Sequence, residues 1–244
     1  MCTATWWRPD LNSTAYRLLF NRDESKQRGP ATPPVEQSTG AGTRFIAPID
    51  SDRGGTWLLV NEFGLTLAIL NHYAAAVREN STAERRSRGE IPLILADCAH
   101  PQEVAKKFTS LESAEFRPFF LLVISPADGP QVHEWDGAEL QSRQTISPPF
   151  TTSSYESARV IRSRIDQFQR IAGPAADADA LEEYHLSMNA NDGAIGVRMR
   201  RPDAQTVSFS RVIVNDEFVQ FDYRPETPDS TKILDEVTVK LRRK

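Results

Sequence analysis

The chain has 244 residues, of which 39% are hydrophobic and 25% are charged, and its formal net charge at pH 7 is −4. This composition is typical of a globular protein rather than a disordered or fibrous one, and we expect a single domain over residues 1–244. Nucleic-acid-binding domains usually carry a clear basic excess, so the charge argues against DNA or RNA and favours a small-molecule substrate or an apolar ligand.

The two cysteines, Cys2 and Cys98, allow at most one disulfide, which fits a reducing compartment. No apolar run reaches the roughly 18 residues of a membrane span, and the N-terminus lacks the apolar core of a signal peptide. We therefore expect a cytoplasmic protein without a membrane span. The sequence does not specify an oligomeric state.

The first predicted element is a hairpin. Residues 2–7 (CTATWW) and 15–20 (AYRLLF) are short aromatic and apolar runs separated by the turn-forming stretch RPDLNST. The polar segment that follows, at about 24–43, contains several proline, glycine and serine residues, and we expect a mobile loop there.

A second hairpin is predicted over residues 54–73. Two apolar runs, TWLLV and LTLAIL, flank a tight turn that contains Gly64. Both runs are nearly continuous in apolar residues, which is typical of strands that are covered on both faces. The pattern therefore predicts that this sheet has another layer on each side.

The rest of the chain adds helices and further strands. Two amphipathic helices are predicted at 101–111 and 153–171, the second capped by Ser153 or Ser154. The order of elements indicates a layered α+β architecture with antiparallel sheets. The remaining expectations are a hairpin at 119–125 and 132–135, a loop at 172–182, strands at 195–200, 206–214 and 218–223, and a C-terminal tail at about 226–244.

Two clusters of basic residues are expected to be solvated surface. One is the run Arg85, Arg86 and Arg88, and the other is the tail after Lys240. Each run is either flanked by acidic residues or terminal, which is the usual setting of an exposed charged segment.

The N-terminus has the residues of a self-contained nucleophile. Removal of Met1 would make Cys2 the first residue, and methionine aminopeptidases favour a small second side chain. The freed α-amine, with a pKa of about 7.7–8.0, could then act as the base for the adjacent thiol. The hairpin returns residues near 20–23 to the terminus, where Arg22 could favour the thiolate and Asp23 could hold the α-ammonium.

These residues resemble a known family. The leading MC, the string NRDE at 21–24, the segment GGTWLLVNEFG and the late segment MRRPDAQTVSFS together resemble the NRDE-domain family, also called the transport and Golgi organisation protein 2 family. The resemblance implies the four-layer αββα sandwich of N-terminal-nucleophile hydrolases, with choloylglycine hydrolases and penicillin V acylases as relatives. It thus implies an N-terminal-cysteine amidohydrolase that acts on non-peptide carbon–nitrogen bonds.

By the same resemblance, several residues acquire expected roles. Cys2 would be the nucleophile, and the side-chain amide of Asn71 would stabilise the oxyanion, with Asn61 as the alternative donor. The acylases space their arginine and aspartate as R-x-x-D, whereas Arg22 and Asp23 are adjacent here. Either Asp23 or Glu24 would therefore fill the acidic role.

An alternative function keeps the fold but not the catalysis. Eukaryotic members of the family are linked to haem movement and to lipid or acyl-CoA metabolism, which implies a binding and trafficking protein with haem as a candidate cofactor. Asn21 and Trp57 are further candidate binding residues. No cofactor is expected for the enzyme, and no metal site, because the four histidines show no ligand spacing.

Overall fold

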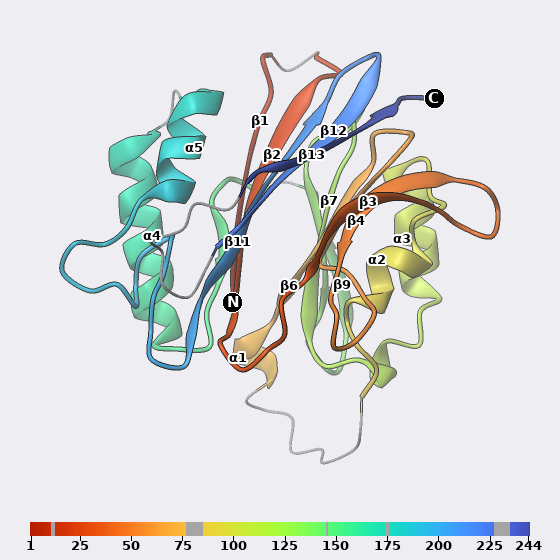
Figure 1. Cartoon of the computed structure of the whole chain (residues 1–244). Helices are drawn as coiled ribbons and strands as arrows, with labels where there is room; N and C mark the ends of the chain where they lie inside the picture. Colours follow the sequence, from red (N-terminus) through yellow and green to blue (C-terminus); the bar gives the residue numbers. More distant parts are fainter. Residues whose placement is uncertain (11–12, 77–84, 145, 174–175, 227–234) are drawn as a thin grey trace.

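Two antiparallel sheets lie face to face between two layers of helices (Figure 1). The computed structural model describes residues 1–10, 13–76, 85–144, 146–173, 176–226 and 235–244. Helices α4 and α5 cover the outer face of one sheet, and α2 and α3 cover the outer face of the other. This arrangement confirms the predicted four-layer αββα sandwich.

The sheet that contains the N-terminus has six strands in the described residues. Its centre is formed by β2 and β11, and the N-terminal strand β1 pairs with β2 on one side and β10 on the other. In spatial order the strands are β10 (Phe150–Thr152), β1 (Cys2–Trp7), β2 (Tyr16–Ser25), β11 (Ala204–Val214), β12 (Phe218–Pro225) and β13 (Val237–Arg242).

The second sheet has seven strands in the described residues, paired in the order of the sequence. They are β3 (Thr32–Ser38), β4 (Arg44–Ile49), β5 (Leu58–Asn61), β6 (Thr66–Asn71), β7 (Phe119–Ile124), β8 (Gln131–Trp135) and β9 (Leu140–Arg143). The helical segments are α1 (Tyr73–Ala76), α2 (Glu90–Ile94), α3 (Pro101–Thr109), a 3₁₀ turn at Ser113–Glu115, α4 (Ser157–Ile171) and α5 (Ala178–Leu186). No helix in the described ranges combines the length and the apolar character needed to cross a bilayer.

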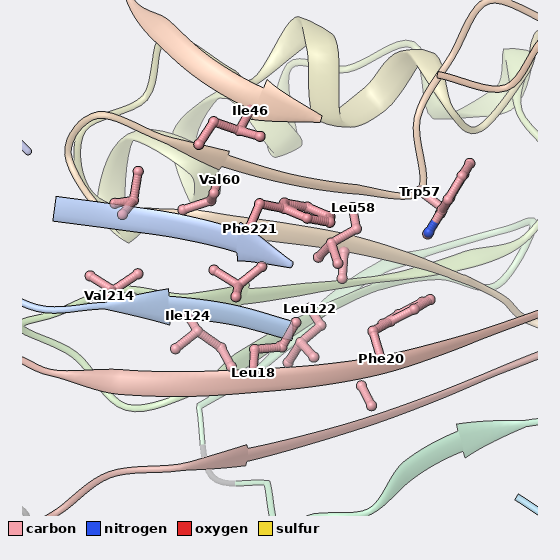
Figure 2. Packing of buried hydrophobic residues seen from close by; sticks show 14 of the residues in the cluster. Leu18, Phe20, Ile46, Trp57, Leu58, Val60, Leu122, Ile124, Val214 and Phe221 are labelled. Carbon is pink, nitrogen blue, oxygen red and sulfur yellow. The ribbon is translucent and has the colours of Figure 1, made fainter. Parts of the chain in front are cut away.

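Apolar side chains from the two sheets meet in a central core (Figure 2). Along β5, Leu58 and Val60 point into this core, whereas Leu59 packs against the layer that contains α2 and α3. In β2, Leu18 and Phe20 face the same core, and Leu19 faces α4 and α5. The alternation confirms that the nearly continuous apolar runs are covered on both faces, and each fully buried side chain of this kind stabilises the fold by about 1.5–3 kcal/mol.

The predicted hairpins and the helix at 101–111 are confirmed. In the second hairpin, Gly64 adopts φ +76°, a conformation that glycine accepts without strain. The longest helix is also confirmed, but it begins at Ser157, and neither Ser153 nor Ser154 caps it. Ser153 instead donates to the carbonyl of Tyr155 at 2.7 Å.

Four expectations about individual segments are wrong. The expected loop at about 24–43 contains β3, an edge strand, and edge positions tolerate the prolines at 33 and 34 because they do not require every backbone N–H. The expected loop at 172–182 contains the start of α5, where the side chain of Asp177 caps the amide of Ala180 at 2.8 Å. The expected strand at 195–200 forms only an isolated bridge at Arg200. The expected C-terminal tail at about 226–244 contributes the strand β13, and residues 227–234 lie outside the described part.

Candidate active site

The register of the first hairpin places the thiol beside the basic residue expected to support it. Cys2 in β1 lies directly opposite Arg22 in β2, as the turn between the two strands predicted. Residues directly opposite on an antiparallel pair project from the same face, so both side chains point toward the other sheet. Cys2 belongs to the central core and is 8% exposed.

A cavity of about 520 Å³ opens beside Cys2. It is lined from both sheets and from the segment that precedes α2. Of the eight residues singled out in the sequence, six line this cavity: Cys2, Arg22, Asp23, Glu24, Trp57 and Asn71.

Met1 is joined to the backbone nitrogen of Cys2, which is therefore a peptide nitrogen and not a free amine. Met1 is 7% exposed, and its α-ammonium donates to the carbonyl of Asp23 at 3.1 Å and to the hydroxyl of Tyr73 at 2.8 Å. Its side chain packs against Met199 and Ala204. The terminal amine is therefore held in a defined place at the wall of the cavity.

The thiol of Cys2 is protonated at neutral pH in this form of the chain. Burial raises the pKa of Cys2 above its ordinary value, and the charge of Asp23 acts in the same direction. The N-terminal ammonium and, more weakly, Arg22 lower the pKa but do not offset the burial. Reactivity thus depends on a base close to the sulfur.

Arg22 is positioned by three neighbours. Its guanidinium donates to Asp50 at 2.7 Å, lies 3.5 Å from a carboxylate oxygen of Glu24 and stacks over the ring of Trp57 at 4.0 Å. Burial opposes ionisation of Asp50, but Arg28 and Arg22 together hold the pKa of its carboxyl below the usual value. Since Asp50 neutralises much of its charge, Arg22 supports the thiolate only weakly.

Asp23 is placed differently from the expectation. Its carboxylate does not hold the α-ammonium, because it accepts hydrogen bonds from Arg164 at 2.9 Å and from Thr206 at 2.7 Å, with no exposed side-chain surface. Successive residues of a strand point to opposite faces, so the carboxylate lies under α4 while Arg22 points into the cavity. The backbone carbonyl of Asp23, rather than its side chain, orients the amine.

Asn71 and Tyr73 form a short relay to the N-terminus. The side-chain amide of Asn71 donates to the hydroxyl of Tyr73 at 2.7 Å, and the same hydroxyl accepts from the α-ammonium. Burial raises the pKa of Tyr73 to about 12, so the hydroxyl is neutral. Tyr73 was not singled out in the sequence, where its only signal is a position two residues after Asn71.

Asn21 and Asn61 are not among the residues that line the cavity. The Asn21 amide donates to the carbonyls of His185 and Val197, on the side of the sheet covered by α5. The Asn61 amide donates to the carbonyls of Ala96 and Cys98, and its oxygen caps the tight turn after β5. Both side chains link adjacent layers of the fold through hydrogen bonds.

The lining of the cavity is basic. Seven arginines contribute to it against three acidic residues. The run Arg85, Arg86 and Arg88, expected to be solvated surface, is part of this lining. Arg86 is exposed as expected, whereas Arg85 and Arg88 are half-buried. In the described ranges, no three histidine, cysteine or acidic side chains are grouped so that they could hold a metal ion.

The comparison with protein families decides the identity of the chain. The family model described as Transport and Golgi organisation 2 matches residues 1–180. The chain belongs to the Transport and Golgi organisation 2 family. No curated protein matches the sequence.

Solved structures similar to this family member share its fold at low sequence identity. A Caenorhabditis elegans orthologue of N-acylethanolamine-hydrolysing acid amidase has a TM-score of 0.56 at 11% identity, covering 99% of this chain and 100% of that one. Penicillin V acylase from Agrobacterium tumefaciens has a TM-score of 0.51 at 13% identity, covering 92% of this chain and 84% of that one. A mutant conjugated bile acid hydrolase from Clostridium perfringens has a TM-score of 0.51 at 12% identity, covering 98% of this chain and 92% of that one. These neighbours show that the fold is shared.

Proposed function

We propose that the protein is an N-terminal-cysteine amidohydrolase that cleaves a non-peptide carbon–nitrogen amide bond after removal of Met1. The observation that carries the proposal is the position of Cys2, which lines a cavity and directly follows the residue whose α-amine is held by the Asp23 carbonyl and the Tyr73 hydroxyl. The three structural neighbours named above are a penicillin V acylase, a mutant conjugated bile acid hydrolase and an orthologue of an N-acylethanolamine-hydrolysing acid amidase.

The reaction would proceed through a thioester. The α-amine of Cys2 takes the thiol proton, the sulfur attacks the carbonyl carbon, and the tetrahedral intermediate collapses with cleavage of the carbon–nitrogen bond. The amine passes the proton to the leaving nitrogen, and water then hydrolyses the thioester to release a carboxylic acid. Asn71 has a second amide N–H available to stabilise the oxyanion while the first binds Tyr73.

Removal of Met1 has to precede folding. Met1 is 7% exposed and its amine is buried against Asp23 and Tyr73, so an aminopeptidase could not reach it in the folded chain. The space that the Met1 side chain vacates lies between Met199 and Ala204, and the Ser153 hydroxyl and the Arg201 guanidinium lie at its polar end. We assign this space to the acyl group of the substrate.

The alternative, a carrier of haem or lipid without catalysis, is less well supported. The side chains around the cavity are mostly charged, whereas sites for apolar ligands are lined predominantly by hydrophobic and aromatic residues. A carrier would retain ligand uptake in a Cys2→Ser variant, and the purified protein would show bound haem or lipid.

The test compares two forms of the same chain, one that begins at Cys2 and one that retains Met1. With an N-acyl p-nitroanilide, the form that begins at Cys2 should release a burst of nitroaniline equivalent to the enzyme concentration. The Met1 form and a Cys2→Ser variant should release none. Equal release from all three forms would refute the proposal.

A further inference from the structure

Three arginines around the cavity have no acidic partner among the residues that the structure describes. Arg22 and Arg28 share Asp50, and Arg86 pairs with Glu90 and Glu115. Of the other four, Arg85 donates to the carbonyl of Ala114. The last three have no carboxylate within 4.0 Å in the described part of the chain: Arg53, Arg88 and Arg117.

Arg88 is the most informative of these. A guanidinium has five N–H donors, and the one hydrogen bond that Arg88 makes with the described residues is from Nη1 to the carbonyl of Pro118 at 3.1 Å. Burial lowers the pKa of Arg88, and the charge of Arg117 acts in the same direction. A partly buried cation beside a second cation is costly unless an anion lies near it.

The acidic residues of the cavity do not supply that anion. Asp50 already binds Arg22 and Arg28, and the carboxylate of Glu24 accepts from the amide of Ser25 at 2.9 Å and lies near the same two arginines. The whole chain carries a net charge of −4, so the local excess of arginine runs against the overall charge. Such a local excess in a cavity concentrates anions there.

The backbone fixes these arginines relative to one another. The amide of Thr56 donates to the carbonyl of Gly89 at 2.9 Å, which joins the segment after Arg53 to the segment that carries Arg88. The joint requires glycine, because a Cβ on Gly55 would lie 2.6 Å from the carbonyl carbon of Gly89. The backbone positions of Arg53 and Arg88 are thus fixed relative to each other before a ligand arrives.

We propose that the cavity binds an anionic group of the substrate, a carboxylate or a phosphate, through Arg88, with the exposed Arg53 and Arg117 at its rim. The planar guanidinium matches both groups in a two-pronged hydrogen bond. The anion site is independent of the proposed function, but the statement that the substrate is an amide rests on it. The two together define the substrate as a small amide that carries an anionic group.

The first test uses the thiol as a reporter. Iodoacetate and iodoacetamide alkylate cysteine alike but differ in charge, so the ratio of their rates at Cys2 measures the attraction of an anion. In the form that begins at Cys2, this ratio should exceed that of free cysteine about tenfold, and Arg88→Gln should remove most of the excess. The control is Arg170→Gln, the same change of charge on an exposed residue of α4, which should leave the ratio unaltered.

The second test needs no reaction. Glutarate, phosphate and neutral glutaramide are titrated calorimetrically into the Cys2→Ser protein and into Cys2→Ser combined with Arg88→Gln. Tighter binding of glutarate indicates a carboxylate, tighter binding of phosphate indicates a phosphate, and either affinity should fall about tenfold without Arg88.

The two proposals fail in different ways. If Cys2 reacts with neither reagent but glutarate or phosphate binds, the amidohydrolase is refuted and the anion site stands. If Cys2 reacts with both reagents at the ratio of free cysteine, and neither anion binds more tightly than glutaramide, the anion site is refuted and the amidohydrolase stands.

Discussion

Replacing Arg164 by methionine tests the buried ion pair behind the nucleophile. The Arg164 side chain has no exposed surface and reaches Asp23 at 2.9 Å, Thr3 at 2.7 Å and the carbonyl of Gly196 at 3.0 Å. Methionine can fill the space of the aliphatic stem but provides no donor. Among the described residues, the carboxylate of Asp23 would then keep a single side-chain hydrogen bond, from Thr206 at 2.7 Å.

The expected cost is large. Removing one partner of a buried ion pair leaves an uncompensated charge and lowers the free energy of unfolding by about 3–5 kcal/mol. Urea denaturation monitored by circular dichroism measures this loss. Adding Asp23→Asn to Arg164→Met removes the uncompensated carboxylate charge. The double variant should therefore regain at least about 1 kcal/mol of the lost free energy of unfolding, since residues in direct contact are coupled.

A matched control comes from the same helix. Arg159 in α4 also pairs with acidic residues, Glu156 at 2.7 Å and Asp192 at 3.0 Å, but its side chain is 53% exposed. Arg159→Met should therefore cost only about 0–1 kcal/mol. If Arg164→Met cost no more than Arg159→Met, the buried pair would not support the strand that carries the site.

Three further predictions concern pH, the loop junction and the oxyanion. Burial, reinforced by the charge of Arg164, lowers the pKa of His185 to about 3, so the folded chain resists the protonation that the unfolded chain undergoes near pH 6.5. This contribution to the free energy of unfolding is complete above pH 6.5 and is lost as the pH falls toward 3, by up to about 1.4 kcal/mol per pH unit. When the free energy of unfolding from urea denaturation is plotted against pH, His185→Gln should show a shallower slope than the unchanged chain over this range. Gly55→Ala forces a Cβ to within 2.6 Å of the Gly89 backbone and should lower the free energy of unfolding by about 1–3 kcal/mol, whereas Gly40→Ala, where nothing lies within 4 Å, should cost far less in the same melts. Asn71→Ala should slow the nitroaniline burst about 10²–10³-fold without loss of folding, and an unchanged burst would exclude it as the oxyanion donor.

The local parts of the site could be predicted from the sequence. The turn between the first two apolar runs sets the register of β1 and β2, and this register alone brings Arg22 opposite Cys2. The nearly continuous apolar runs around β5 and β6 predicted two covered faces, and the structure has a layer on each.

The remaining parts depend on pairings across long stretches of chain. Arg164 and Asp23 lie 141 residues apart, and no local pattern shows that the guanidinium, rather than the α-ammonium, binds the carboxylate. The acidic flank of the run from Arg85 to Arg88 suggested a solvated surface. In the structure Glu90 binds Arg86, which leaves Arg88 without an acidic partner among the described residues.

The most direct test of the central claim is the intact mass of the purified chain, measured before and after treatment with a thiol-reactive acylating probe. The account predicts that Met1 is absent and that one acyl group is added at Cys2 well before Cys98, which is buried behind the other sheet. A chain that retains Met1, or an adduct that forms at Cys98 as fast as at Cys2, would contradict it.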